Sequence, residues 1–436
     1  MSVVQHDTSP ARPAARPVPD SVVVVGAGLA GAQTVAALRA HGFDGRLTLL
    51  GAEGVPPYDR PPLSKELLTR PEPVWLSDDI GVDVASLADD LRLAEPATAL
   101  ASTPDAVVVT TASGGELRAD AVVLAVGAEA VKPTGWDDAV VLHTADDAAR
   151  LRAALRPGLR LVVVGAGWVG AEVAGVAAGA GADVTVVEAA SAPLERQLGA
   201  GVGAHLAGWY ADAGVRLLTG APVAEVRDDV VRLADGRSLA ADLVLAAVGA
   251  RPASAWLAGS VPLDARGTVP AGPDGAVPGH PRVWAVGDVA SRAHPVFGTV
   301  PGGHWSAALH DPDVTARAML GLEPGPGHAP YVFSRQLGHD LALLGLPGTG
   351  PVAWRGEPGG PGPWAAFYLD GDERGEHGTG AADGVATVRA VLLVDSPREV
   401  GAVRRLMNRG EPLRLDLERA TDPATRLRDA VADPAR

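Results

Sequence analysis

The sequence predicts an α/β protein with two related βαβ units, followed by a third domain of the α+β class. A short valine run, a glycine-rich turn and an alanine-rich helical pattern occur at residues 21–38 and again at residues 161–178. From about Pro324 the composition changes to Pro/Gly-rich loops between alternating strands. With 436 residues and 47% hydrophobic content, the chain can bury several cores.

Each repeat predicts buried parallel strands. A parallel strand that is covered on both faces needs a continuous apolar run, and Val22 to Val25 and Leu161 to Val164 fit this pattern. A helix of ordinary length then leads to a second apolar strand, at Leu47 to Leu50 and at Val184 to Val187. Each repeat is therefore a βαβ unit of the Rossmann type.

Later segments predict how the domains are arranged. Apolar strands at residues 121–127, 242–249 and 283–288 indicate that a second domain is inserted into the first. In the third domain we predict strands at Trp364 to Leu369 and Val385 to Val394, and a helix with Ser396 as N-cap. The predicted parts are a disordered arm at 1–20, a first dinucleotide-binding domain at 21–135 and 250–325, a second at 136–249, an α+β domain at 326–423 and a tail at 424–436.

Composition excludes several classes of protein. A net charge of -15 and a pI near 5.1 argue against a nucleic-acid partner, which needs a basic face. No apolar run approaches the roughly 18 residues of a membrane span, and residues 1–20 lack the apolar core of a signal peptide, so we expect a cytoplasmic protein. The chain has no cysteine, which excludes disulfides, thiolate metal sites and a redox dithiol. No metal site is predicted.

The first glycine-rich turn predicts a dinucleotide site. In VVVVGAGLAG, Gly26 permits a tight turn, Gly28 lets a pyrophosphate approach the backbone, and Gly31 lets the helix pack on the strand. Glu53 follows the second strand at the distance that suits a ribose partner. A glycine-rich turn without a ligand is the alternative. The other residues of the turn that we expect at the cofactor are Ala27, Leu29 and Ala30.

The second turn, in LVVVGAGWVG, repeats the pattern. Its glycines are Gly165, Gly167 and Gly170, and Glu188 follows the second strand. A carboxylate there would accept hydrogen bonds from a ribose 2'-hydroxyl and repel a 2'-phosphate, which favours NADH over NADPH. A solvated strand end is the alternative for Glu188. Trp168 and Val169 complete the expected contacts of this turn.

Two such turns, with a later strand that ends in Gly287 and Asp288, resemble the two-dinucleotide flavoprotein superfamily. The segment YDRPPLSKELL at Tyr58 to Leu68 resembles the oxygenase-coupled NADH-dependent ferredoxin reductases and the related apoptosis-inducing-factor branch. Similar segments also occur at residues 165–175, 184–199, 283–290 and 397–410. The resemblance covers about residues 21–423.

The resemblance implies that FAD and NADH are the cofactors. Arg60 and Lys65 would contact FAD, with Lys65 near flavin N5 and paired with Glu172, and Asp288 would hold the ribitol chain. General physical chemistry supports these roles. A buried lysine needs a carboxylate partner, and a cation near N5 stabilises the negative charge that develops there. The alternatives are an exposed helix-capping lysine at Lys65 and a surface acid at Glu172.

Further cofactor contacts follow from the same resemblance, and so do departures from the family pattern. The chain has Glu129 where the family has arginine, Gly303 where it has glutamate and Ala342 where it usually has glutamine. His304 would be a proton relay or, as we favour, a packed or solvated histidine. The remaining implied contacts are Ala97, Ala125, Gly127, Arg196, Gly249, Trp305 and Phe333.

An acidic [2Fe-2S] ferredoxin is the electron acceptor that the resemblance implies, for a monomer or weak homodimer. Such a partner needs a positive docking surface, and a cluster of arginines near the C-terminus offers one. An arginine-rich helix surface with no partner is equally open, and so are an NADH oxidase, a small-molecule tailoring flavoenzyme and a non-catalytic NADH/FAD-binding redox sensor. The arginines are Arg398, Arg404, Arg405, Arg409 and Arg414.

Overall fold

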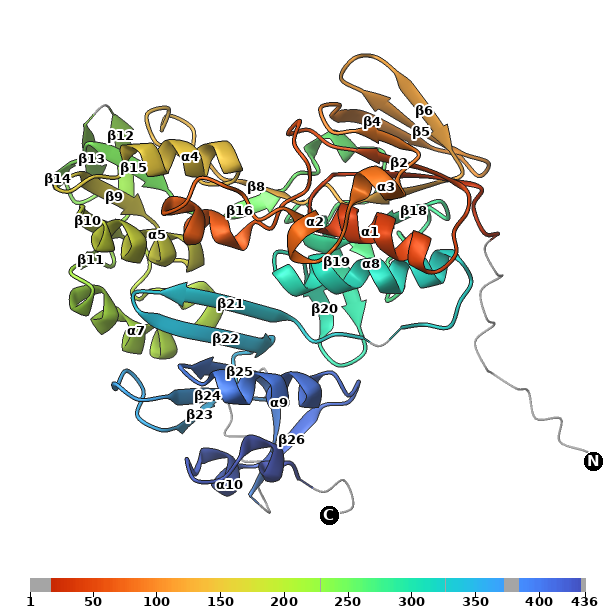
Figure 1. Cartoon of the computed structure of the whole chain (residues 1–436). Helices are drawn as coiled ribbons and strands as arrows, with labels where there is room; N and C mark the ends of the chain where they lie inside the picture. Colours follow the sequence, from red (N-terminus) through yellow and green to blue (C-terminus); the bar gives the residue numbers. More distant parts are fainter. Residues whose placement is uncertain (1–16, 228, 326, 372–383, 433–436) are drawn as a thin grey trace, which may run out of the picture.

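The computed structural model describes residues 17–227, 229–325, 327–371 and 384–432. These residues form two α/β lobes that lie side by side and an α+β lobe below them (Figure 1). The predicted fold class is confirmed. The loop predicted at residues 370–384 lies almost entirely outside the described residues, and so does most of the predicted N-terminal arm.

The first lobe is built on a parallel sheet of order β18-β7-β1-β2-β3. The strand β18 pairs with β7 although residues 125–282 separate the two in sequence, so the chain leaves this sheet and returns to it. Buried valines and leucines fill the strands, as both faces are covered. The strands are β1 (Ser21–Val25), β2 (Arg46–Leu50), β3 (Asp90–Arg92), β7 (Ala121–Leu124) and β18 (Val283–Ala285).

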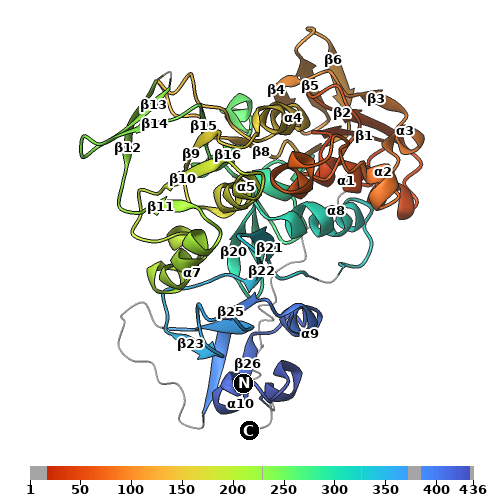
Figure 2. The same cartoon turned by 60° about the vertical axis from the view of Figure 1, so that its left-hand side comes forward.

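Helices cover one face of this sheet and small antiparallel sheets pack against the other. The helices α1 (Leu29–Ala40) and α8 (Trp305–Met319) lie next to each other (Figure 2) and share one core with β1 and β2. His41 at the end of α1 bonds to Asp313 of α8 at 2.7 Å. The antiparallel strands are β4 (Ala97–Ser102), β5 (Val107–Thr111), β6 (Glu116–Ala119), β17 (Val269–Ala271), β19 (Ala290–His294) and β20 (Gly298–Pro301).

The second lobe repeats the design. Its parallel sheet has the order β11-β10-β9-β15, an antiparallel sheet β12-β13-β14 packs against it, and the two-stranded ribbon β8-β16 joins it to the first lobe. Its strands are β9 (Arg160–Val164), β10 (Asp183–Val187), β11 (Arg216–Leu218), β12 (Val223–Arg227), β13 (Val230–Leu233), β14 (Ser238–Ala240) and β15 (Leu243–Ala246), and the ribbon consists of β8 (Ala128–Ala130) and β16 (Ala250–Pro252).

The third lobe is an antiparallel sheet of order β21-β22-β25-β24-β23, with β26 paired to β25 and α9 packed alongside. The predicted strands are found as β24 (Trp364–Leu369) and β25 (Val385–Val394). The core of this lobe includes Leu427 and Ala430, so its packing extends beyond the predicted boundary at residue 423. The other elements are β21 (Tyr331–Gln336), β22 (His339–Gly345), β23 (Val352–Arg355), β26 (Leu413–Asp416) and α9 (Pro397–Met407).

The predicted start of α9 is confirmed in position but lacks a capping hydrogen bond. The helix begins at Pro397 with Ser396 as its N-cap residue, as predicted, but the Ser396 hydroxyl makes no capping hydrogen bond. That hydroxyl donates to the carbonyl of Val394 at 2.9 Å, back toward β25, and the backbone carbonyl of Ser396 accepts from Glu399. The Ser396 hydroxyl is therefore engaged by the turn that ends β25 and does not bond to a backbone N–H in the first turn of α9.

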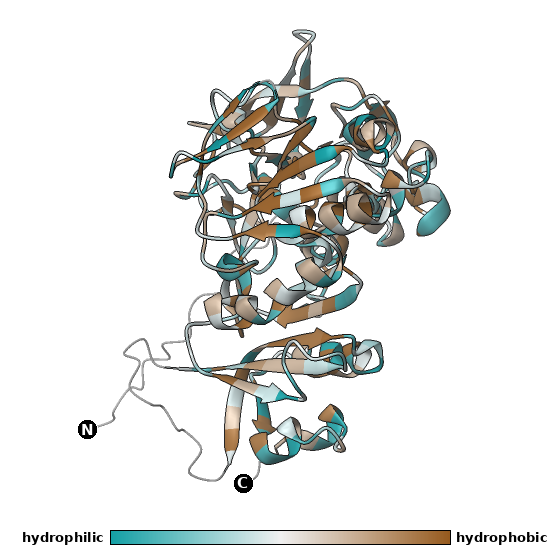
Figure 3. Ribbon diagram, turned by 90° about the vertical axis from the view of Figure 1, so that its left-hand side faces the viewer, coloured by the Kyte–Doolittle hydropathy of each residue, from teal (hydrophilic) through white to brown (hydrophobic). Residues whose placement is uncertain are grey.

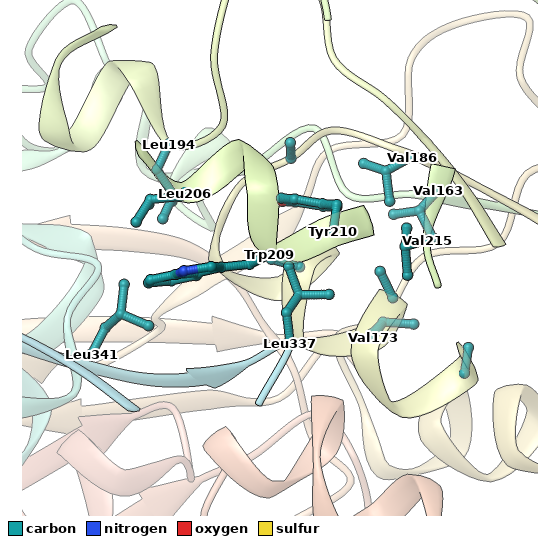
Figure 4. Packing of buried hydrophobic residues seen from close by; sticks show 14 of the residues in the cluster. Val163, Val173, Val186, Leu194, Leu206, Trp209, Tyr210, Val215, Leu337 and Leu341 are labelled. Carbon is teal, nitrogen blue, oxygen red and sulfur yellow. The ribbon is translucent and has the colours of Figure 1, made fainter. Parts of the chain in front are cut away.

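Apolar packing joins the second and third lobes. Trp209 of α7 (Ala200–Asp212) packs among Leu337 and Leu341 of the β21-β22 hairpin (Figure 4), and its ring stacks on His339 at 4.0 Å. Figure 3 shows that the strands are among the most apolar parts of the chain, in keeping with their burial. Because the third lobe shares a core with the second, it holds the second glycine turn in a fixed position.

The remaining helices connect the strands and sheets of the described residues. None of the helices in the described ranges is long and apolar enough to cross a membrane. The remaining elements are α2 (Leu76–Asp79), α3 (Val84–Leu87), α4 (Ala145–Ala154), α5 (Trp168–Gly179), α6 (Glu195–Leu198), α10 (Leu417–Thr421), η1 (Pro61–Ser64), η2 (Glu66–Leu68), η3 (Ala255–Leu257), η4 (Gly287–Val289) and η5 (Leu427–Ala430).

Candidate functional site

The first glycine turn joins β1 to α1 and requires glycine for steric reasons. Gly26 has φ of 112°, and a Cβ there would lie 2.2 Å from the carbonyl oxygen of Ala125. A Cβ on Gly31 would lie 1.8 Å from the carbonyl oxygen of Gly26, so helix and strand touch. At Gly28, in contrast, a Cβ would meet nothing within 4 Å. The turn is therefore tight inside and open on the side from which a pyrophosphate would approach.

A cavity of about 350 Å³ opens beside this turn, at the carboxyl ends of β1 and β2. Ligands of open α/β sheets bind at this edge. Its wall contains Ala97, a predicted cofactor contact, together with Glu95 and Glu129, but not Glu53. The Glu129 carboxylate is paired with Arg251 at 3.0 Å. The lining residues are Val25, Gly26, Leu50, Gly51, Ala52, Glu95, Pro96, Ala97, Val126, Glu129, Ala253, Ala255 and Trp256.

Glu53, the predicted ribose partner, is engaged within the protein. Its carboxylate forms an ion pair with Arg60 and accepts a hydrogen bond from the Tyr58 hydroxyl at 2.7 Å. Arg60 also donates to the carbonyl of His143 at 2.5 Å, and the Tyr58 hydroxyl accepts from the backbone N–H of Ala145 at 3.0 Å. This network ties the loop after β2 to the start of α4 in the second lobe.

The second glycine turn repeats the first. Gly165 has φ of 108°, and a Cβ there would lie 2.4 Å from the carbonyl oxygen of Ala247, while Gly167 again faces open space. Glu188 accepts hydrogen bonds from the backbone N–H groups of Ala166 at 2.7 Å and Ala190 at 2.8 Å. These bonds hold the carboxylate against the glycine turn, where a ribose would follow the pyrophosphate, rather than leaving it as a solvated strand end.

A buried ion pair lies where the lobes meet. Lys65 Nζ lies 2.9 Å from Glu172 Oε1, with side-chain exposures of 13% and 5%. Lys65 follows η1 of the first lobe, and Glu172 lies early in α5, the helix that starts at the second glycine turn. Lys65 Nζ also donates to the carbonyl of Pro61 at 3.1 Å. The predicted pair is therefore in contact, and neither alternative, an exposed lysine or a surface acid, describes it.

Two serines that the sequence analysis did not single out complete this junction. The Ser64 hydroxyl donates to Glu172 Oε2, and the Ser334 hydroxyl, on β21 of the third lobe, donates to Oε1 at 2.5 Å. Both serines are buried. Glu172 thus binds groups from all the lobes at once. Ser64 precedes Lys65 in the recognised segment, whereas only the fold brings Ser334 within reach.

Aromatic side chains lie beside the ion pair. The Phe333 ring lies 5.7 Å from Lys65 Nζ and meets the Trp305 ring edge to face, with centroids 6.0 Å apart. The indole N–H of Trp305 donates to Asp59 Oδ1 at 2.9 Å. Burial raises the pKa of Asp59, and the Trp305 hydrogen bond opposes this. Of the predicted contacts, Phe333 therefore adjoins Lys65, and Trp305 adjoins Phe333.

Asp288 and His304 occupy the entrance to α8. Asp288, in η4, accepts a hydrogen bond from the Gly303 backbone N–H at 3.2 Å, and burial raises its pKa. His304 is the N-cap of α8, and its Nδ1 accepts from the N–H of Ala307 at 3.1 Å. Burial lowers the pKa of His304 to about 4, so the ring is neutral at neutral pH. The geometry is that of a packed, capping histidine.

The other predicted contacts lie at the two turns or on exposed surface. Ala27, Leu29 and Ala30 pack in the first core, and Ala125 is buried at the end of β7. Gly127 and Gly249, beside the ribbon strands, have φ of 69° and 116°. On the second lobe, Trp168 and Val169 begin α5, Val169 is 41% exposed, and Arg196 of α6 is exposed.

The predicted docking arginines lie on or after α9. All five are exposed, and within the described ranges none of them forms an ion pair with a carboxylate. Arg404 lies close enough to His310 and His328 that its charge helps to lower the pKa of both rings, after the larger effect of burial on each. A basic surface therefore borders α8 at His310.

The sequence profile of the family described as pyridine nucleotide-disulphide oxidoreductase matches residues 20–310. The chain belongs to this family. The match covers both glycine turns, Lys65, Glu172 and Asp288. The disulphide chemistry in the family name needs cysteines, and this family member has none.

Within this family, the chain is similar to reductases that are named for ferredoxin partners. The ferredoxin--NAD(+) reductase subunit of a benzene 1,2-dioxygenase system from Pseudomonas putida is 31% identical over 94% of this chain and 97% of its own length. The corresponding component of a biphenyl dioxygenase system from Paraburkholderia xenovorans is 32% identical over 94% of this chain and 98% of its own length. The putidaredoxin reductase chain in its covalent complex with putidaredoxin has a TM-score of 0.81 and 28% identity, over 90% of this chain and 94% of that one.

The burial of His304 predicts a pH effect on stability. Its pKa rises from about 4 in the folded state to the ordinary 6.5 on unfolding, so the unfolded state binds more protons between these values. Stability is fully present above pH 6.5 and falls with pH, with a loss of about 2 kcal/mol from this group at pH 5. His304→Asn keeps an N-cap acceptor but cannot bind the proton, so it should remove this contribution to the pH dependence. The measurement is the free energy of unfolding in urea at pH 7 and at pH 5, for the wild type and the variant. Equal losses in wild type and variant would contradict the assignment, and His280→Asn is the control.

Proposed function

We propose that this chain is an FAD-dependent oxidoreductase that takes a hydride from NADH and delivers electrons to a [2Fe-2S] ferredoxin of an oxygenase or cytochrome P450 system. The observation that carries the proposal is the buried Lys65–Glu172 pair between two matched dinucleotide turns. Relatives of nearly the same length that are named ferredoxin--NAD(+) reductase components support the choice of donor and acceptor.

FAD fits the first lobe. The open face of Gly28 and the N-terminus of α1 suit its pyrophosphate, and the cavity beside the turn suits its adenosine. Asp288 offers a carboxylate for the ribitol hydroxyls. Because Glu53 is paired with Arg60 and is not among the residues that line the cavity, we assign the adenosine end to the wall that contains Glu95, and give Glu53 the role of fixing the loop that carries Arg60.

NADH fits the second lobe. The open face of Gly167 and the N-terminus of α5 suit its pyrophosphate, and Glu188, fixed by two backbone N–H groups, would accept the ribose hydroxyls. The half-buried Trp168 and the exposed Val169, at the start of α5, lead from this turn toward Glu172. The nicotinamide end would therefore lie on the side of the second lobe that faces Lys65 of the first lobe.

Bound FAD would supply the central chemistry, since it accepts a hydride as an electron pair and releases electrons singly. The protein groups support this by electrostatics. Lys65 presents a cation where negative charge develops, and Glu172 holds that cation in place with two hydroxyls and one carbonyl nearby. A fixed charge costs no reorganisation at the moment of transfer, whereas a flexible lysine would need to be ordered first.

The acceptor would dock on the basic surface of α9. Each NADH supplies two electrons and each [2Fe-2S] acceptor takes one, so one NADH and two oxidised ferredoxins give NAD+, a proton and two reduced ferredoxins. The exposed arginines from Arg398 to Arg414 complement an acidic partner. We propose that the chain works as a monomer or weak homodimer.

The direct test is the visible spectrum of the purified protein during anaerobic NADH titration, followed by ferredoxin addition. We expect a yellow protein with FAD that is released on heating, bleaching by NADH, and recovery of the colour when oxidised ferredoxin is added. A colourless protein that does not take up FAD would contradict the proposal. So would reoxidation that ferredoxins do not accelerate beyond the rate with dioxygen.

The position of Glu188 predicts cofactor preference. The wild-type protein should prefer NADH, and Glu188→Ala should narrow this preference by about tenfold to a hundredfold, the value of a hydrogen bond to a charged group. Glu188→Arg should narrow it further or reverse it. The measurement is kcat/KM with NADH and NADPH, with Asp212→Ala as the control on an exposed acid of the same lobe. Equal use of both nucleotides by the wild type would contradict the assignment.

The basic surface predicts a salt-sensitive acceptor reaction. Replacing Arg404 and Arg405 by glutamate should slow ferredoxin-dependent cytochrome c reduction about tenfold at low salt and less at high salt, because salt screens exposed charges beyond about 10 Å at 0.1 M. Bleaching of the flavin by NADH should keep its rate. Arg118→Glu is the control, since Arg118 is exposed on β6 at the opposite end of the molecule (Figure 1). An equal loss in the control would rule out α9 as the docking surface.

A further inference from the structure

A row of aromatic side chains lies beside Lys65 and extends toward Arg404 of α9. Trp305, the first residue of α8, meets Phe333 of β21 edge to face at 6.0 Å. Phe333 stacks on Tyr331, two residues earlier on the same face of β21, with centroids 6.1 Å apart and ring planes at 29°. We call Trp305, Phe333 and Tyr331 the aromatic row. Its members come from different lobes, so the fold itself brings them together.

The outer end of the row lies near the docking arginines. Burial raises the pKa of Tyr331, and the nearby charge of Arg404 partly offsets this effect. The backbone N–H of Tyr331 donates to the Ser306 hydroxyl at 3.0 Å, which fixes β21 against the first turn of α8. Tyr331 therefore lies between the proposed flavin site and the proposed ferredoxin surface.

Trp305, at the other end of the row from Tyr331, is tied to Asp59. The indole N–H of Trp305 donates to Asp59 Oδ1 at 2.9 Å, and the Asp59 backbone is itself fixed by a bond from its N–H to the Val74 carbonyl at 2.8 Å. Phe333, next in the row, also contacts the Lys65 cation. Asp59 and Lys65 lie on one loop of the first lobe, where Asp59 bonds to Trp305 and Lys65 lies against the Phe333 ring.

We propose that Asp59 is a positioning residue for electron transfer to the acceptor: its hydrogen bond fixes the Trp305 indole against Phe333 and so sets the packing of the aromatic row. This inference rests on the proposed function. Electron transfer between packed groups weakens steeply as the gap between them grows, so a rotated indole that no longer packs against Phe333 would loosen the row beside Lys65 and slow delivery to α9. The binding of ferredoxin, which depends on the α9 surface, would change little.

Paired substitutions separate this role from general stability. Asp59→Leu removes the acceptor, Asp59→Asn retains an oxygen that can accept from the indole, and Trp305→Phe keeps a ring but removes the N–H. Asp78→Ala is the matched control, since Asp78 is an exposed acid of α2, close in sequence to Asp59. Rapid-mixing measurements give two rates for each protein, flavin bleaching by NADH and reoxidation by ferredoxin.

We expect Asp59→Leu and Trp305→Phe each to lower kcat for ferredoxin about tenfold more than they lower the rate of flavin bleaching, with KM for ferredoxin within about twofold of wild type. Asp59→Asn should recover most of the loss. The double variant Asp59→Leu, Trp305→Phe should be no slower than either single variant, because both remove one and the same bond. Asp78→Ala should match the wild type.

A readout that does not depend on turnover is hydrogen exchange of the Trp305 indole N–H, assigned by its absence in Trp305→Phe. It should be slow in the wild type and in Asp59→Asn, and fast in Asp59→Leu. The inference is overturned if the two rates fall equally, if Asp59→Asn is as slow as Asp59→Leu, or if the indole remains protected in Asp59→Leu. A wild-type protein that NADH does not bleach would instead overturn the proposed function, so the two failures are distinguishable.

Discussion

The constraint on which the site depends is the burial of one carboxylate among groups from separate lobes. Glu172 reaches out of the second lobe to Lys65 and Ser64 of the first and to Ser334 of the third. A buried carboxylate is costly unless it is fully paired, and removal of one partner from such a pair typically costs about 3–5 kcal/mol. The lobes must therefore assemble in this arrangement for Glu172 to be satisfied, and the same arrangement fixes the cation at the site.

The two glycine turns supply the second constraint, and it is a backbone one. Gly26 and Gly165 both have φ near 110° and both face a carbonyl oxygen closer than any Cβ could approach. Gly28 and Gly167 both face open space. Two lobes of one chain thus present the same phosphate-sized opening at a helix N-terminus, and the ion pair lies between them. The two matching openings are what a fold needs to bind two dinucleotides, one on each lobe.

Local patterns in the sequence predicted much of the fold, because buried parallel strands need continuous apolar runs and tight turns need glycine. The valine runs, β24, β25 and the start of α9 are found as predicted. Details that depend on competing hydrogen bonds or on long-range contacts could not be predicted from the sequence. Ser396 is the N-cap residue of α9 as predicted, but its hydroxyl bonds to the Val394 carbonyl, and the core of the third lobe includes residues as far along as Ala430. At the site, the hydrogen bond from Ser334 to Glu172 joins residues that are far apart in the sequence, so only the fold brings them together. The ion pair between Arg60 and Glu53 depends on the conformation of the loop after β2, which the sequence pattern does not specify.

The measurement that tests the account most directly is the rate of flavin bleaching by NADH in Lys65→Met, a substitution that keeps much of the apolar stem and removes the charge. The account predicts a loss of about a hundredfold in this rate, of the size found when a charge-stabilising group is removed from an active site. Exposed Lys132→Met, on the link between the first two lobes, should leave the rate unchanged. If Lys65→Met holds FAD and bleaches at the wild-type rate, the cation has no part in the reaction, and the central role of the Lys65–Glu172 pair is contradicted.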